Sequence, residues 1–140
     1  MFDFKFDWND DLSLQIKDVD EQHKELFRIG RDIEQLLMIR CIGVKPEQLL
    51  KIVGDLRDYT AYHFYEEENL MKSAQYSRLE EHVKEHSMFR SEVLHIDMPK
   101  LSKNPCKELL KIKDMIQDHV FTHMMEEDKL MAEEIRLKLK

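Results

Sequence analysis

The sequence has few residues of the kinds that interrupt helices or cross-link small proteins. Among its 140 residues there are three glycines, three prolines, two cysteines and one tryptophan. Scarce glycine and proline, together with little strand-like alternation, favour an all-helical protein. The two cysteines, Cys41 and Cys106, are far apart in the sequence and neither has a CxxC neighbour. They therefore predict two free thiols in a reducing cytosol rather than a disulfide framework.

Long apolar runs and excess positive charge are also missing. No stretch approaches the roughly 20 apolar residues of a membrane-spanning helix. The N-terminal segment MFDFKFDWNDD lacks the basic start and apolar centre of a signal peptide. The net charge of −7 disfavours a nucleic-acid partner. We therefore expect a single domain, residues 1–140, in the cytoplasm, with no membrane and no nucleic-acid partner.

Apolar residues recur with the helical period along most of the chain. Residues 1–18 form an arm in which aromatic residues alternate from Phe2 to Trp8, as in an extended segment laid across a bundle. Asp18 or Asp20 is suited to cap the first helix. Four amphipathic helices with short connections predict an all-α, up-down-up-down four-helix bundle. The expected helices span about 20–40, 46–72, 78–95 and 106–138, with connections at 41–46 and 100–105.

Polar residues with metal-binding chemistry lie on the apolar stripes of these expected helices. Imidazole nitrogen and carboxylate oxygen are ligands for first-row divalent metals such as iron, manganese and zinc. Burying each of them without a partner costs about 1–3 kcal/mol, so a bundle that buries several at one level must satisfy them jointly. A metal ion does this by accepting one lone pair from each. The candidate ligands are His23, His63, Glu67, His82, His86, His123 and Asp128.

Part of this set also fits simpler or different sites. A single histidine on an apolar face, such as His23, is usually a core residue bonded to a backbone carbonyl. The segment from His82 to His86 matches the H-x-x-E-H signature of inverted zinc peptidases, which would make Glu85 a general base. That interpretation leaves three histidines unused, and the chain is short for such an enzyme. We therefore expect Glu85 to be a solvated residue on the third helix.

Four segments resemble the motifs of the hemerythrin family, in its single-domain bacterial form. The stretch DVDEQHKELF at residues 18–27 resembles the first-helix motif of that family, and HFYEEE at 63–68 resembles its HFxxEE motif. The spacing of His82 and His86 resembles the third-helix pair. His123, followed five residues later by Asp128, resembles the fourth-helix HxxxxD motif. All seven ligand positions of the family are filled.

The resemblance implies a cofactor of two iron ions bridged by an oxo or hydroxo group. Glu67 and Asp128 would bridge both ions. Three histidines would complete one iron, and two would leave the other with an open site. The implied function is reversible dioxygen binding for storage, delivery or sensing, rather than enzymatic turnover. By position, His82, His86 and His123 belong to the first iron, and His23 and His63 belong to the second.

The resemblance also implies a dry, apolar pocket for dioxygen, because water and stray protons would leave the centre oxidised. Phe27, Phe64 and Met125 are candidates to line it. His119 departs from the family, which usually has a large aromatic one turn before the fourth-helix histidine. His119 is either bonded to a carboxylate such as Glu127, or is a proton donor or extra ligand. The second case would make the protein a di-iron enzyme acting on peroxide or another small oxidant.

The carboxylate of the fourth helix is uncertain by geometry. Five residues are about 500° of ideal helix rotation, which places Asp128 about 140° away from His123. Glu127 fits an ideal helix better and continues the apolar stripe to Leu130. The family pattern favours Asp128, which requires a rotated path or a local π-type widening. We predict Asp128 as the ligand and Glu127 outside the ligand set.

Overall fold

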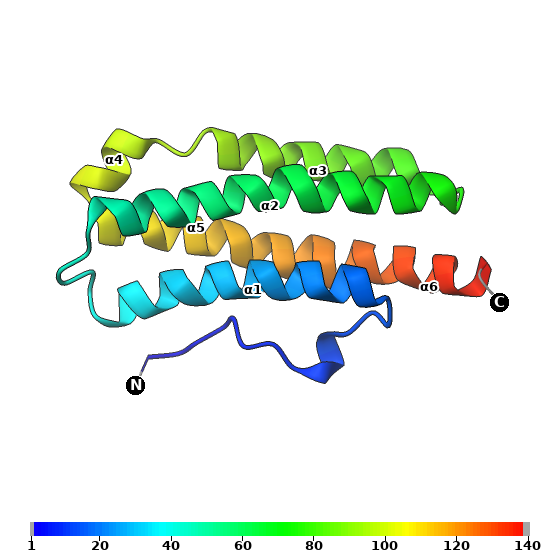
Figure 1. The fold of residues 1–140 in the computed structure, drawn as a ribbon, viewed down its shortest axis with the longest axis horizontal. Coiled ribbons are helices and arrows are strands. Elements are labelled where there is room, and N and C mark those ends of the chain that lie inside the picture. The colour runs from blue at the N-terminus through cyan, green and yellow to red at the C-terminus, as the bar shows by residue number, and fades with distance from the viewer. Residues whose placement is uncertain (1, 139–140) are drawn as a thin grey trace.

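The computed structural model describes residues 2–138, and all regular elements in this range are helical. Helices α1, α2 and α3 and the continuous rod α5–η2–α6 pack as an up-down-up-down bundle (Figure 1), so the predicted all-α fold is confirmed. None of the described helices is long and apolar enough to cross a membrane. The elements are η1 (Asp10–Leu12), α1 (Lys17–Met38), α2 (Pro46–Ser73), α3 (Leu79–Leu94), α4 (Met98–Lys103), α5 (Pro105–His119), η2 (Val120–Asp128) and α6 (Lys129–Lys138).

The start of α1 differs from the sequence prediction. The residue at the N-cap is Ile16, and no side chain caps the helix. Because α1 begins earlier than expected, Asp20 lies inside its first turn and reaches back to the preceding loop. Its carboxylate accepts hydrogen bonds from the backbone N–H of Leu14 at 2.8 Å and from the hydroxyl of Ser13 at 2.5 Å. The prediction that Asp18 or Asp20 caps the first helix was therefore wrong.

The connection expected at residues 100–105 is partly helical. Helix α4 begins after Asp97, whose carboxylate accepts a hydrogen bond from the backbone N–H of Lys100 at 3.0 Å. Pro99 lies in the first turn, where the fixed backbone angle of proline suits a helix and its missing N–H is not needed. The short helix buries Leu101 completely against the core. A cap, an N-terminal proline and one buried leucine therefore account for a helix that the sequence pattern missed.

Both cysteines are free thiols in the structure. Cys41 follows α1 and is buried, while Cys106 is half-buried in the first turn of α5. Burial, and then a hydrogen bond with the thiol of Cys106, raises the pKa of Cys41 to about 12. Cys41 therefore stays protonated and unreactive at neutral pH.

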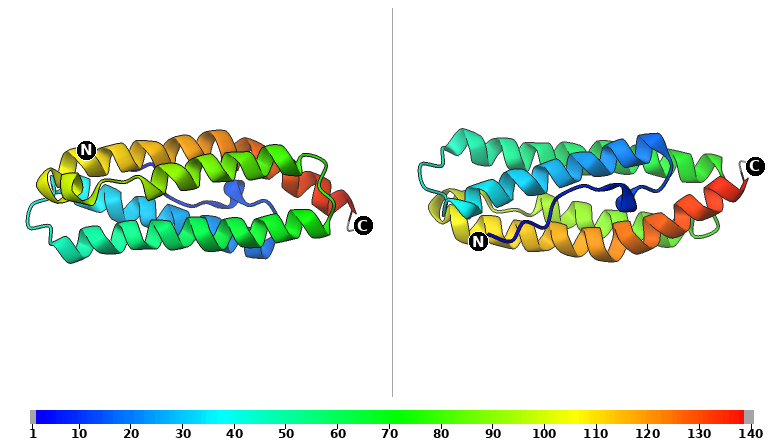
Figure 2. Two further views of the ribbon diagram at one scale, coloured as in Figure 1. Left: turned by 90° about the horizontal axis from the view of Figure 1, so that it is seen from above. Right: turned by 90° about the horizontal axis from the view of Figure 1, so that it is seen from below.

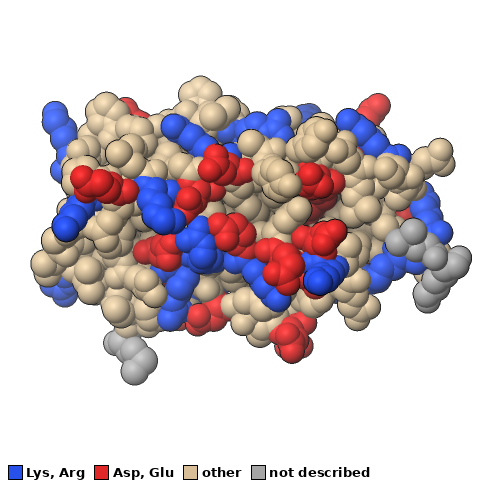
Figure 3. Space-filling model, in the orientation of Figure 1, with Lys and Arg blue, Asp and Glu red and all other residues tan. Residues whose placement is uncertain are grey.

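Charged side chains of both signs are interspersed on the face formed by α1 and α2 (Figure 3). The guanidinium of Arg28 lies 2.6 Å from Glu25, 2.6 Å from Asp32 and 2.9 Å from Asp55 across the helix pair. The ammonium of Lys51 lies 2.7 Å from the same Asp55 carboxylate. Exposed pairs of this kind contribute about 0–1 kcal/mol each, so they align α1 with α2 but do not replace the core.

The N-terminal arm runs along α1 and covers its seam with α5 (Figure 2). Its anchor is Phe6, which is buried and meets the ring of Phe27 edge-on at 5.8 Å. Trp8 makes a second edge-on contact with Phe27 at 5.4 Å. The ring of Phe6 lies directly against the backbone of Gly30, where only a residue without a Cβ leaves enough space.

A buried carboxylate also holds the arm. Glu34 of α1 is fully buried, and its two oxygens accept hydrogen bonds from the backbone N–H groups of Lys5 at 2.6 Å and Phe6 at 3.0 Å. The ammonium of Lys113 from α5 lies 3.5 Å away. The extended arm has no neighbouring strand to accept hydrogen bonds from its backbone N–H groups, and Glu34 accepts two of them instead.

The contact of Phe6 with Gly30 predicts opposite effects for two glycine substitutions. In Gly30→Ala the new Cβ would lie 2.5 Å from Cγ of Phe6, so the arm must shift, and we expect a loss of about 1–3 kcal/mol in unfolding free energy. In Gly54→Ala, within α2, the Cβ meets no atom within 4 Å, and we expect a gain of about 0.5–1 kcal/mol. Denaturant unfolding of the two variants measures both values. Equal stability would contradict the close packing of the arm.

Candidate metal centre

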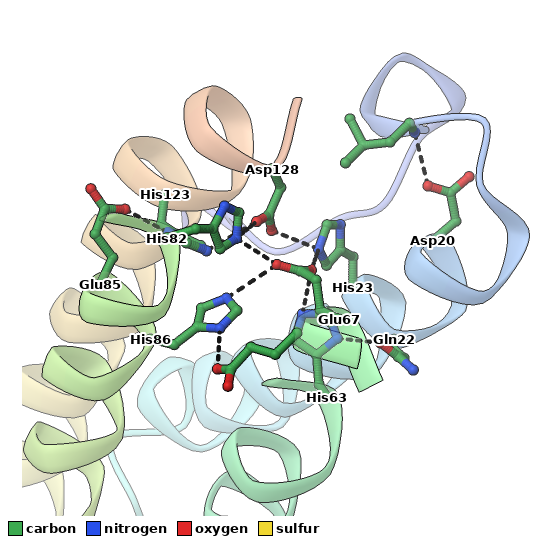
Figure 4. Close-up of polar contacts among 12 residues, drawn as sticks. Asp20, Gln22, His23, His63, Glu67, His82, Glu85, His86, His123 and Asp128 are labelled. Carbon is green, nitrogen blue, oxygen red and sulfur yellow. Dashed lines mark hydrogen bonds and ion pairs between the residues drawn. The ribbon is translucent and has the colours of Figure 1, made fainter. Parts of the chain in front are cut away.

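Five histidines surround two carboxylates in the interior of the bundle (Figure 4). All four long helical segments contribute, and no residue of the cluster is more than 3% exposed. The structure therefore brings all seven residues singled out in the sequence into one cluster. They are His23 from α1, His63 and Glu67 from α2, His82 and His86 from α3, and His123 and Asp128 from η2.

Asp128 lies between three of the imidazoles. The Nε2 atoms of His23, His82 and His123 lie 2.9 Å, 2.8 Å and 3.0 Å from its carboxylate oxygens. These histidines come from three different helical segments. Asp128 therefore joins α1, α3 and η2 at one point.

Glu67 makes the corresponding contacts from α2. The Nε2 atoms of His63, His82 and His86 lie 3.2 Å, 2.6 Å and 3.1 Å from its oxygens. His82 thus touches both carboxylates. Because every one of these contacts uses Nε2, the rings all point the same nitrogen toward the middle of the cluster.

The ligand atoms fall into two groups that share both carboxylates. Within each group the candidate atoms lie within 4.8 Å of one another, as one metal ion requires. One group contains three histidines and the other contains two, so the second offers one ligand fewer. The first group is Glu67, His82, His86, His123 and Asp128, and the second is His23, His63, Glu67 and Asp128.

A π-helical segment brings Asp128 to the cluster. Residues Val120–Asp128 form η2, in which the wider i to i+5 turn replaces the ordinary helical turn. This widening rotates Asp128 onto the face that carries His123. Asp128 is buried, whereas Glu127 is half-buried with its carboxylate 3.7 Å from Arg78.

The same widening shifts the apolar stripe beyond His123 by one residue. The stripe expected from ideal geometry ran through Glu127 and Leu130. In the structure Leu130 is 44% exposed and Met131 is fully buried. That part of the predicted stripe was therefore wrong, because the inserted residue of a π turn cannot be seen in a pattern of ordinary helical period.

Three of the imidazoles also form a hydrogen bond through Nδ1, the ring nitrogen that does not contact Glu67 or Asp128. The Nδ1 atom of His63 hydrogen-bonds to the side-chain oxygen of Gln22, and that of His86 bonds to Glu68 at 2.9 Å. The Nδ1 atom of His123 bonds to Glu85 at 2.6 Å. Such outer partners fix ring orientation and raise the basicity of Nε2.

The outer partners were missed or misjudged from the sequence. Glu85 was expected to be solvated, but it reaches from α3 to His123 while its side chain stays 41% exposed. This contact also argues against the zinc-peptidase interpretation, in which Glu85 would be a general base, because Glu85 accepts a hydrogen bond from His123 of another helical segment. Gln22 and Glu68 directly neighbour the ligand candidates His23 and Glu67 in sequence, but adjacency alone does not reveal an outer hydrogen bond.

The two carboxylates are ionised despite their burial. Burial, and then the charge of Asp128, would raise the pKa of Glu67, but His63 and His82 outweigh both and hold it well below its ordinary value. Burial would likewise raise the pKa of Asp128, but the charge of His123 and the close contacts with His23 and His82 hold it well below its ordinary value. Both side chains are therefore available as anionic ligands at neutral pH.

Two of the imidazoles, those of His82 and His123, have a raised pKa. Burial alone would lower the pKa of His82, but its close contact with Asp128 and its hydrogen bond to Glu67 raise it to about 10. Burial would also lower the pKa of His123, but the charge of Asp128 raises it to about 9. Burial lowers the pKa of His63, so that ring is neutral at neutral pH.

Several polar atoms of the cluster remain without a hydrogen-bond partner. They include Nε2 of His23, Nε2 of His123, Oε2 of Glu67 and both carboxylate oxygens of Asp128. The contacts of Asp128 with His23, His82 and His123 are short, but none of them is a hydrogen bond. Buried lone pairs that converge in this way are satisfied by a metal ion, and the nitrogen and oxygen donors suit first-row metals.

His119 lies beside the cluster and belongs to neither ligand group. Its ring is 6% exposed and is stacked between Phe89, at 3.9 Å, and His123, at 4.8 Å. It makes no hydrogen bond to Glu127, so the carboxylate partner suggested from the sequence is wrong. Burial, and then the charge of His123, lowers the pKa of His119 well below its ordinary value, so its ring is neutral.

The apolar residues around the cluster agree in part with the sequence prediction. Phe64 is fully buried and stacks on His86 at 3.9 Å, and Phe27 is buried in the same core. Met125 is only half-buried, and its neighbour Met124 is the buried methionine of this segment. The interior position predicted for Met125 is therefore filled by Met124, which lies four residues after the buried Val120.

The fold and the cluster define a cation-binding helical bundle. Residues 14–135 match the family described as the Hemerythrin HHE cation binding domain. The chain therefore belongs to the hemerythrin family, and its buried histidines and carboxylates form a hemerythrin-type metal site.

Three relatives to which this chain is similar are named bacteriohemerythrin. The one from Clostridium acetobutylicum is 27% identical over 124 residues, which cover 89% of this chain and 96% of the relative. The one from Stenotrophomonas maltophilia is 25% identical over 132 residues, or 94% of this chain and 82% of the relative. A third, from Pseudomonas paraeruginosa, is 34% identical over 85 residues, which cover 59% of this chain and 51% of the relative. No solved structure matches the chain.

The position of Asp128 predicts that two neighbouring carboxylates differ in metal binding. Asp128→Asn removes an anionic ligand shared by both groups, so we expect a loss of metal affinity greater than the roughly 10–100-fold cost of losing an outer partner. Glu127→Gln, the matched control, should leave affinity unchanged because Glu127 lies outside both groups. Metal per chain after ferrous loading measures the difference. Loss of metal in Glu127→Gln alone would refute this geometry.

The raised pKa values predict that metal binding releases protons. At pH 7, His82, with a pKa of about 10, and His123, with a pKa of about 9, both carry a proton in the metal-free protein. Because a metal ion takes neutral imidazole, binding should release about two protons per chain, and affinity should rise with pH up to about 10. A pH indicator in weak buffer counts the protons on addition of Fe²⁺ or Zn²⁺. Affinity that does not change with pH would contradict the prediction.

Proposed function

We propose that this protein is a non-haem di-iron protein that binds dioxygen reversibly, for storage, delivery or sensing. The observation that carries the proposal is the unequal pair of ligand groups that share Glu67 and Asp128. One group has five ligand atoms and the other has four. A shared pair of carboxylates suits two metal ions side by side, and the smaller group leaves room for a small ligand.

Iron is the metal that the proposed function requires. The same nitrogen and oxygen ligands accept manganese or zinc, but zinc has no redox chemistry. Two iron ions, bridged by an oxo or hydroxo group as well as by the carboxylates, would supply two electrons and one free coordination position for dioxygen. We further propose that the protein works in the cytoplasm, since its two free thiols suit a reducing compartment.

The side chains around the cluster support reversible binding by excluding water and withholding protons. Phe64 and Met124 are buried beside the histidines, so the interior there is apolar. Glu67 and Asp128 are ionised and carry no proton to give. His119 is neutral and its low pKa leaves it without an acidic proton. Loss of a reduced oxygen product needs a proton, and none of these groups supplies one readily.

A di-iron enzyme acting on peroxide or another small oxidant is the second candidate. The observation that favours it is the Nε2 atom of His119, which is buried without a hydrogen-bond partner. However, His119 stacks on His123, which belongs to the five-ligand group rather than to the group with the open position. The geometry therefore favours dioxygen binding over peroxide chemistry.

The test is the addition of dioxygen to the anaerobically reduced, iron-loaded protein. We expect two iron ions per chain and uptake of about one dioxygen per iron pair, with an absorbance change that argon reverses. Rapid irreversible oxidation with peroxide turnover would support the enzyme instead. His119→Phe serves as the companion variant: a slower autoxidation would assign His119 a role in that chemistry. A protein that binds no iron would overturn both candidates.

A further inference from the structure

A tyrosine hydroxyl is buried beside the cluster without a partner. Tyr59 of α2 is 5% exposed, and its ring stacks on His63 at 4.8 Å with an interplanar angle of 19°. It also meets the ring of Phe64 edge-on at 6.0 Å. Its Oη atom is buried and makes no hydrogen bond to any residue that the structure describes. A phenylalanine would fill the same space without leaving a polar atom unsatisfied, so packing alone does not explain the hydroxyl.

Tyr59 lies beside the half of the cluster that has fewer ligands. His63, on which Tyr59 stacks, is one of the two histidines of the four-ligand group. Burial is the main cause that raises the pKa of Tyr59, followed by the charges of Asp128 and Glu67. Its pKa lies well above the ordinary value, so Tyr59 stays a neutral donor.

A cleft leads from the surface to the same place. It encloses about 270 Å³ between α1 and α2, and its lining includes Gln22, Tyr59, Tyr62 and His63. Tyr62 lies at the exposed rim with 66% of its surface accessible, whereas Tyr59 and His63 are buried. A small molecule that enters here meets the stacked rings of Tyr59 and His63 directly before the cluster.

We propose that Tyr59 donates a hydrogen bond from Oη to dioxygen held in the four-ligand half of the centre and so slows its release. This inference rests on the proposed function. A bound oxygen molecule that has drawn electron density from the metal is a good hydrogen-bond acceptor. A phenol that keeps its proton stabilises that charge without protonating the ligand, which reversible binding requires.

The first experiment compares Tyr59→Phe with Tyr62→Phe, a matched control at the rim of the same cleft. Stopped-flow measurement of dioxygen release from the iron-loaded proteins should show release about 3–10-fold faster in Tyr59→Phe, the effect of losing one ordinary hydrogen bond. Tyr62→Phe should release dioxygen at the wild-type rate. The O–O stretching frequency in resonance Raman spectra should shift only in Tyr59→Phe. Both variants should keep the wild-type iron content, because neither residue is a ligand.

The second experiment uses the metal-free protein. Because Oη has no partner there, Tyr59→Phe should unfold at the same temperature as the wild type or at a higher one. A lower melting temperature would reveal a structural partner and overturn the inference. An unchanged release rate and Raman frequency in Tyr59→Phe would overturn it too, while leaving the proposed function standing. A wild-type protein that does not bind dioxygen would overturn both.

Discussion

The burial of two carboxylates within reach of one imidazole is the constraint on which the bundle depends. Nε2 of His82 lies 2.6 Å from Glu67 and 2.8 Å from Asp128, and all three side chains are buried. Two negative charges at such a place are strongly unfavourable unless cations or a metal compensate them. The five imidazoles supply part of that compensation, and they come from all four long helical segments. The rotation of each helix about its own axis is therefore tied to the cluster.

This constraint also explains the one irregular helical segment of the bundle. An ordinary helix through His123 would direct Glu127 inward and leave Asp128 on another face. The π segment Val120–Asp128 adds a residue to the turn, so that the shorter side chain of Asp128 reaches His23, His82 and His123 at once. Widened turns of this kind are uncommon and occur often at functional sites. Here the site requires the widening, and α6 then continues with its buried face displaced by one residue.

The features that could be predicted from the sequence are those that a single helix encodes. Period and ligand chemistry place His63 and Glu67, or His82 and His86, on one face, and the family motif identifies Asp128. Contacts between helices have no such signature. The bonds of Glu85 to His123 and of Gln22 to His63 depend on how two helices are rotated against each other. The π turn was recognisable only as a conflict between the motif and ideal geometry.

The polar side chains beside the two ligand groups can take part in hydrogen bonds but do not readily transfer protons. His119 borders the five-ligand group and Tyr59 borders the four-ligand group, and each has a buried polar atom without a partner. Burial keeps both side chains neutral, since it lowers the pKa of His119 and raises that of Tyr59. A neutral phenol next to buried carboxylates can donate a hydrogen bond but has little tendency to lose its proton. His119 and Tyr59 thus offer polarity without acidity beside the cluster, as the proposed reversible binding of dioxygen requires.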